Sequence, residues 1–367
     1  MLRRTGNWKT LAAVEDHKSA PAQLQLFWDR FRLLRPNHEI FELEKTGGVV
    51  LERTLPMMLH GDEGRSKKRQ GVLCISCHSV LGRGVQTRKK RNLAAMQETQ
   101  QMNYTGATHC TRFLLSVLPK FYYDQTDKAF HSMVDFITRD IGNLTKKGVA
   151  GPDGLSYYVA IISIKGDWPF LHKVGGLRRS FYNQPKRSEA KKACVGICHW
   201  CQAGQPGIPF EDLSPNCEWQ FTLGVETPWV EQPIVLKNLC HDRSFPESFL
   251  HPDPWHGHHL GEGRNFVCNI MRLLLDITPG RNVDIRLDTL FNEYRSFCQR
   301  AHTQCYCTKF TENLFGVKSP NDFPNGSWTK GNFTTSLVKW VASFLQSKRN
   351  IFHPGSLLEK AVTWSTC

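Results

Sequence analysis

Apolar residues recur along the chain with two different spacings. Helical spacing predicts helices over residues 24–34, 127–146, 287–298 and 335–345, and a further helical face around Phe266 and Ile270. Short apolar runs bounded by turn residues predict strands over 55–60, 72–77, 108–118 and 157–164, of which the last is the strongest. The chain therefore mixes helices and strands in one polypeptide.

The order of these elements indicates a particular α/β arrangement. Three strands, a helix and a strong fourth strand follow one another between residues 55 and 164. This is the opening order of the ribonuclease-H-like fold, although other α/β domains begin in a similar way. We therefore predict an α/β protein with a ribonuclease-H-like mixed sheet.

The character of the chain changes after this segment. Residues 181–250 are rich in Cys, Pro, Gly and Trp and carry little periodic apolar pattern, whereas helical pattern returns from His256 onward. We predict four parts: an N-terminal helical region over 1–50, the sheet core over 51–180, a Cys-rich insertion over 181–250, and a helical part over 251–367 that completes the core.

Composition and charge narrow the classes of function. The chain has 47 Lys and Arg against 33 Asp and Glu, a net charge of +14, and 40% hydrophobic residues. This hydrophobic content excludes a largely disordered chain, and we expect neither a membrane span nor a signal peptide. The positive charge favours a polyanionic partner, nucleic acid above all, over plain basic solubility. We expect a soluble intracellular protein.

Two acidic residues occupy equivalent local positions. Asp62 and Asp167 each follow an apolar strand and a glycine. Carboxylates at the ends of adjacent strands can converge on Mg²⁺ or Mn²⁺, and two such ions would support phosphodiester cleavage. The alternative is that both are turn residues that cap the next element.

A group of cysteines has the spacing of a zinc site. Cys194, Cys198 and Cys201 lie close together, with Cys217 downstream, which suits tetrahedral zinc with a structural role. Buried thiols without metal are the alternative. Cys74 and Cys77 share the spacing but lie in a predicted strand, where they point to opposite faces, so we exclude them.

Histidines and basic runs add two further candidate regions. His256 lies in a histidine-rich segment that suits a metal or phosphate site, or equally a solvated loop. The basic runs suit DNA phosphates or nuclear import, or equally a solvated hairpin. The candidate DNA contacts in these runs are Lys67, Lys68, Arg69, Arg88, Lys89, Lys90 and Arg91.

Four motifs in this order resemble the core of CACTA (En/Spm-like) and Plavaka-type DDE transposases. They are Gly61-Asp62, then Gly166-Asp167 leading through a glycine to Cys198-x-x-Cys201, then Asp253-x-x-His256, then Trp328-Thr329-Lys330-Gly331. The leader over 55–81 also resembles uncharacterised multi-copy proteins of protist genomes.

The resemblance implies a mobile-element protein of the nucleus that binds and cleaves DNA with two divalent metals. It makes Asp62 and Asp167 catalytic, with His256 beside Asp167, and requires a third acid, for which Glu293 is the best candidate. With two carboxylates in place of three, metal affinity and rate should fall. The alternatives are a catalytically inactive, element-derived DNA-binding protein and a zinc-stabilised interaction module. Enzymatic activity and homo-oligomerisation are left open.

Overall fold

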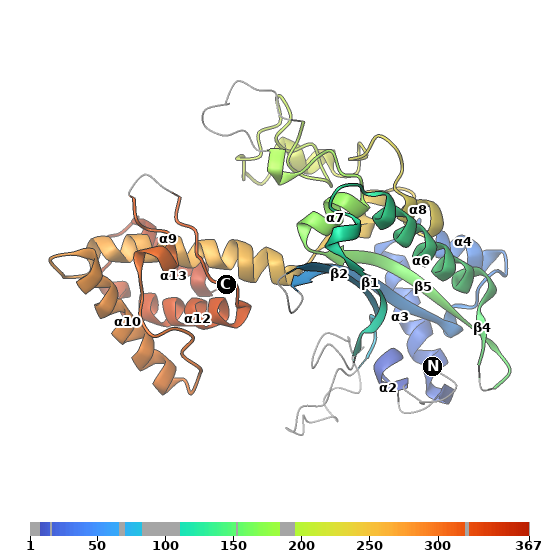
Figure 1. The fold of residues 1–367 in the computed structure, drawn as a ribbon, viewed down its shortest axis with the longest axis horizontal. Helices are drawn as coiled ribbons and strands as arrows, with labels where there is room; N and C mark the ends of the chain where they lie inside the picture. The colour runs from blue at the N-terminus through green and yellow to red at the C-terminus, as the bar shows by residue number, and fades with distance from the viewer. Residues whose placement is uncertain are drawn as a thin grey trace. The chain divides into compact units, whose positions relative to one another are not determined.

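The computed structural model describes residues 8–14, 17–65, 70–82, 111–151, 153–183, 195–319 and 323–366. The chain divides into two compact units, Met1–Pro252 and Asp253–Cys367. Each unit contains a hydrophobic cluster of its own. In the ribbon of Figure 1 the first unit is coloured from blue to yellow and the second from orange to red.

The first unit combines strands with helices of very different length. Its strands are β1 (Thr54–Arg65), β2 (Gly71–Ser79), β3 (Phe113–Pro119), β4 (Val149–Ala150), β5 (Ser156–Gly166) and β6 (Leu250–Pro252). Its α-helices are α2 (Trp8–Leu11), α3 (Ala20–Leu34), α4 (Glu39–Lys45), α6 (Lys128–Lys147), α7 (Trp168–Val174) and α8 (Ile234–Asn238). Short 3₁₀ turns are η1 (His17–Ser19), η2 (Leu51–Arg53), η4 (Lys120–Tyr122), η5 (Phe181–Asn183), η7 (Glu218–Thr222) and η8 (Pro246–Phe249).

Within the described ranges, the six strands form one mixed sheet. The order is β3-β2-β1-β5-β4, and β6 pairs with the end of β5. β2 runs antiparallel to both of its neighbours, β1 and β3, whereas β5 runs parallel to both β1 and β6. The crossover from β3 to β5 contains α6, as a parallel connection requires. The α/β class predicted from the sequence is confirmed.

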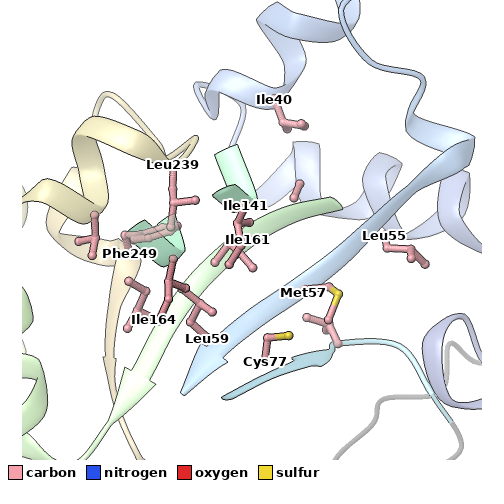
Figure 2. Packing of buried hydrophobic residues seen from close by; sticks show 14 of the residues in the cluster. Ile40, Leu55, Met57, Leu59, Cys77, Ile141, Ile161, Ile164, Leu239 and Phe249 are labelled. Carbon is pink, nitrogen blue, oxygen red and sulfur yellow. The ribbon is translucent and has the colours of Figure 1, made fainter. Parts of the chain in front are cut away.

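Helix α6 packs its apolar face against β5. Phe130, Val134, Ile137 and Ile141 are buried at helical spacing along it. At the end of the helix, the Thr145 hydroxyl donates to a β5 carbonyl over 2.6 Å. Figure 2 shows part of this core, where residues of α6, β5 and β1 meet side chains from the segment before β6. Sheet and crossover helix therefore share one core.

The N-terminal helices belong to the same core as the sheet. Trp28 of α3 is fully buried, and its indole donates to the Thr54 carbonyl at the start of β1 over 2.9 Å. Before α4, His38 forms a backbone bridge with Asp242, and Arg243 pairs with Glu39 at 2.8 Å. Residues before β1 thus contact residues before β6.

The second unit is helical throughout its described part. It contains the π-helix η9 (Trp255–Glu262), α9 (Gly263–Ile277), α10 (Val283–Arg300), α11 (Glu312–Phe315), α12 (Gly331–Ser347), η10 (Arg349–Ile351) and α13 (Leu357–Thr366). Its core includes Tyr294 of α10 and Trp340 of α12, whose rings lie 5.6 Å apart. No helix among the residues described in either unit is long and apolar enough to cross a membrane.

The long predicted elements are confirmed, and their limits differ by a few residues. The predicted first strand, 55–60, extends to Arg65 because β2 continues to pair with it. The predicted third strand begins at Phe113 rather than residue 108, and residues 108–110 lie outside the described part. Cys74 is exposed and Cys77 is buried on β2, as their exclusion as a metal pair required.

Candidate metal site

Asp62 and Asp167 come together on neighbouring strands of the sheet. β1 and β5 are parallel, and their glycines Gly61 and Gly166 are paired in register. Each aspartate is the residue after its glycine, and the two carboxylates place oxygen atoms within 4.8 Å of each other. Both side chains are half-buried. The convergence expected from the sequence is therefore present in the first unit.

The two glycines permit this approach because a phenylalanine ring covers them. A Cβ on Gly61 would meet the Phe170 ring at 2.2 Å, and a Cβ on Gly166 would meet the Gly61 carbonyl oxygen at 2.4 Å. Phe170 lies in the first turn of α7, and Asp167 accepts its N–H over 3.0 Å. Seating this ring on the paired glycines brings the start of α7, and so Asp167, onto the sheet.

The predicted turn around Asp62 is wrong in one respect. Asp62 lies inside β1, paired with Cys74 of β2, rather than in a turn after the strand. The antiparallel partner β2 extends beyond the end of β5, so β1 stays extended on that side. Asp167, by contrast, both ends a strand segment and caps α7, so the capping interpretation holds for it alongside the convergence.

Glu63, the next acid on β1, has a different environment. Successive strand residues point to opposite faces, and Glu63 accepts hydrogen bonds from Tyr123 at 2.7 Å and Lys120 at 3.1 Å. Burial raises the pKa of Glu63, but these two hydrogen bonds outweigh it and leave the pKa below its usual value. Glu63 is thus held in an ion pair, away from the aspartate pair.

A lysine and a histidine flank the aspartates on the sheet. His60 and Lys165 are paired in register, two residues before Asp62 and Asp167 respectively. Arg112 lies 3.2 Å from the ring of the buried His78 on β2. Burial, followed by the charges of Lys165 and Arg112, lowers the pKa of His78 to about 3. The surroundings of the pair therefore favour an anionic ligand beside a bound cation.

His256 follows the sheet closely in sequence. Pro252, the last residue of β6, is paired with Gly166, and His256 comes four residues later. The imidazole Nδ1 lies 3.2 Å from the carboxylate of Asp253, and Asp253 also accepts the Trp255 N–H at 3.0 Å. The Asp253 carboxylate thus contacts both the backbone of this turn and a half-buried histidine. Glu293 lies exposed on α10.

Cys198 and Cys201 form a tight turn in the first unit. The Cys198 thiol accepts the Trp200 N–H at 3.4 Å. A hydrogen bond from the Cys201 thiol lowers the pKa of Cys198 to about 6 despite burial, and the same bond raises the pKa of Cys201. Sulfur atoms that accept backbone N–H bonds suit a thiolate–metal site.

The other predicted zinc ligands and the candidate DNA contacts are not brought together with Cys198 and Cys201 in the described part of the chain. Cys217 is buried, whereas Cys194 lies outside the described residues. Among the residues that the structure describes, no third Cys, His, Asp or Glu brings its ligand atom within 4.8 Å of both Cys198 and Cys201. The candidate DNA contacts Lys67, Lys68, Arg69, Arg88, Lys89, Lys90 and Arg91 also lie outside the described residues.

Two features around the site have no counterpart in the sequence analysis. The first is Phe170, whose position was signalled only by Asp167 and Pro169, a capping residue and a proline two residues into a helix. The second is Arg179, a buried residue that donates to the carbonyls of Cys198 at 3.0 Å and His199 at 3.4 Å, and pairs with Glu226 at 3.3 Å. Arg179 thereby orders the Cys-rich segment from within.

A scan of protein-family models finds none that matches the chain, and no curated protein matches its sequence.

Proposed function

We propose that the chain is a transposase-like, DNA-binding protein that cleaves phosphodiesters at Asp62 and Asp167 with divalent cations. The observation that supports this most directly is the approach of the two carboxylates to within 4.8 Å on adjacent parallel strands. A cation with ligand distances of about 2.1–2.4 Å spans at most about 4–5 Å between two of its ligand atoms. The pair therefore fits Mg²⁺ or Mn²⁺ with small side-chain adjustments.

The strand order supports the ribonuclease-H-like part of the proposal. An antiparallel β1-β2-β3 meander, a crossover helix and two further parallel strands give the order that the fold requires. The first aspartate on the central strand and the second at the end of its parallel neighbour are what the resemblance to CACTA and Plavaka-type transposases implies.

Metal binding and phosphate binding would be carried out by different residues of the site. Asp62 and Asp167 would hold the cations, and the hydrogen bond from the Phe170 N–H fixes the Asp167 carboxylate. His256 is the further residue that the resemblance to CACTA and Plavaka-type transposases implies, as a phosphate contact or a residue that orients a metal-bound carboxylate. Lys165 and His60 would attract the phosphate. When bound, the cations would activate water and stabilise the leaving oxygen.

A second candidate function is DNA binding without cleavage. It is favoured by the absence of a third carboxylate: among the described residues of the first unit, no other Asp or Glu brings an oxygen within 4.8 Å of both Asp62 and Asp167. We propose in either case that DNA is the partner, the nucleus the location, and a structural zinc the metal at Cys198 and Cys201, with Cys194 and Cys217 as further ligands.

The test compares isosteric variants for Mn²⁺ binding and for nicking of supercoiled plasmid DNA. Asp62→Asn and Asp167→Asn should each weaken Mn²⁺ binding at least about tenfold and abolish nicking, since each removes an anionic ligand. Asparagine still caps a helix, so Asp167→Asn should fold normally. Glu63→Gln is the matched control and should leave both measurements unchanged.

The outcomes separate the two candidates. Loss of nicking in both aspartate variants, with DNA binding retained, supports the enzyme. DNA binding without nicking in the parent protein supports the second candidate. Nicking that persists in Asp62→Asn at the parent rate would refute the assignment of the site.

A further inference from the structure

Six rings form a continuous series that passes directly beside Asp167. They follow one another with neighbouring centroids 4.6, 5.0, 5.2, 4.9 and 5.6 Å apart. In order, the rings belong to Tyr182, Phe181, Trp168, His199, Trp200 and His251. Trp168 is the residue after Asp167, so the series starts at exposed rings, passes the residue next to the candidate site, continues through the cysteine turn and ends at His251 of β6.

The inner part of this aromatic series is held rigidly. The Trp168 indole donates to the hydroxyl of buried Ser180 at 2.9 Å, and the same oxygen accepts the Tyr182 N–H at 3.2 Å. The buried His199 ring lies 3.0 Å from the Leu250 carbonyl through Nε2. A rigid support of this kind orients the outer rings.

The outer end of the series is exposed. Phe181 is 50% exposed and Tyr182 is 60% exposed, although both carry large apolar rings. Burial and then the charge of Asp167 raise the pKa of Tyr182, which places the phenol within electrostatic range of the candidate metal site. Two solvent-facing rings therefore stand next to the carboxylate that would hold the cation.

The chemistry of the surroundings indicates what these rings contact. Lys165 and His60 beside the aspartates, and the net charge of +14, favour a polyanion over an apolar protein segment. An unpaired nucleobase offers a flat face that stacks on an exposed aromatic ring, whereas bases within a duplex have both faces covered. A nucleotide whose phosphate lies at Asp167 has its base within reach of the neighbouring rings.

We propose that Phe181 and Tyr182 form a stacking platform for an unpaired base adjacent to the phosphate bound at Asp62 and Asp167. This inference rests on the proposed function and specifies its substrate as single-stranded DNA or an unpaired DNA end. The platform prefers unpaired over duplex DNA and does not depend on base identity, since every base has a π-face.

The test measures the affinity of a fluorescent single-stranded oligonucleotide and of its duplex by anisotropy, in EDTA so that metal binding does not contribute. The double variant Phe181→Ala/Tyr182→Ala should weaken single-strand binding about tenfold, which corresponds to 1.4 kcal/mol and lies within the range of base–aromatic stacking. Duplex binding should change less than about twofold. Phe136→Ala, at a 68% exposed position on α6, is the matched control.

A leucine double variant distinguishes stacking from general apolar contact. Phe181→Leu/Tyr182→Leu keeps apolar side chains without aromatic faces, and it should bind single strands as weakly as the alanine variant. Full affinity of the leucine variant, or an equal loss for duplex and single strand, would overturn the platform. If the parent binds and nicks DNA while both double variants match it, only the platform fails. If the parent neither binds nor nicks DNA, the proposed function fails as well.

Discussion

Replacement of Gly166 by alanine should separate the two strands that carry the aspartates. The new Cβ would lie 2.4 Å from the Gly61 carbonyl oxygen, whereas ordinary contacts begin at 3.4 Å. The strands must therefore move apart by about 1 Å, a fifth of the usual spacing of about 4.8 Å between neighbouring strands. The obstacle is backbone, so no side-chain rotation relieves it.

The cost can be estimated from this geometry. Overpacking of a core costs about 1–3 kcal/mol, and each weakened strand hydrogen bond adds about 1 kcal/mol. A loss of about 2–4 kcal/mol should lower the melting temperature of the first unit by roughly 4–16 °C, at about 2–4 °C per kcal/mol for a domain of this size. Because Asp167 follows Gly166, Mn²⁺ affinity should fall at the same time.

Calorimetry and Mn²⁺ titration of matched variants check the reasoning. Gly64→Ala lies on β1, the strand of Gly61, with nothing within 4 Å of the new Cβ. Its unfolding free energy should therefore stay within about 0.5 kcal/mol of the parent's. Gly61→Ala collides with the Phe170 ring instead, and Phe170→Leu should rescue it in part. Phe170→Leu should restore less of the stability lost in Gly166→Ala, because the Gly61 carbonyl oxygen is the nearest obstacle there. A Gly166→Ala protein with the melting temperature and Mn²⁺ affinity of the parent would refute the close approach of β1 and β5 at the paired glycines.

Three further predictions concern buried ionisable groups. Both carboxylate oxygens of Glu247 are buried without a hydrogen-bond partner among the described residues, and burial raises the pKa of this carboxyl. Its charged form therefore lowers the stability of the folded state once the pH exceeds the ordinary pKa of glutamate. Glu247→Gln should raise the melting temperature more at pH 8 than at pH 5, and an equal rise would contradict this. Burial lowers the pKa of His38 to about 4. Its contribution of about 3 kcal/mol to the free energy of unfolding is therefore present above pH 6.5 and is lost as the pH falls toward 4. In urea titrations, the His38→Gln variant should lose less unfolding free energy over that range than the parent. Purified protein should contain about one zinc per chain by mass spectrometry, and Cys198→Ser should lose most of it; less than half a zinc in the parent would reject that site.

The parts of the fold that sequence predicted are those with strong local pattern. Helix α6 and strand β5 carry apolar residues at a single period over many residues, so local spacing specifies both type and extent. Helix α7 was missed because seven residues are too few for a periodic pattern. The extension of β1 past Asp62 depends on pairing with β2, which local sequence does not encode.

In the candidate site, too, the sequence predicted the residues with a local signal and missed those whose role depends on distant contacts. Asp62 and Asp167 could be selected because each follows an apolar strand and a glycine, a signal carried by adjacent residues. The role of Phe170 depends on glycines from two strands more than one hundred residues apart. The aromatic series likewise joins Trp168 to His251, residues that only the folded sheet brings together. Non-local contacts of this kind leave no periodic trace.

The short connection from β6 to His256 sets an effective concentration. Pro252 is paired with Gly166, and four residues span at most about 14 Å even when fully extended. This bound follows from the covalent chain alone and holds for any orientation of the second unit. A group tethered within this distance of Gly166 has a millimolar effective concentration or higher there, which a side chain on a separate molecule would reach only at millimolar protein. The covalent connection therefore limits the separation of His256 from the end of β5, whatever the orientation of the second unit.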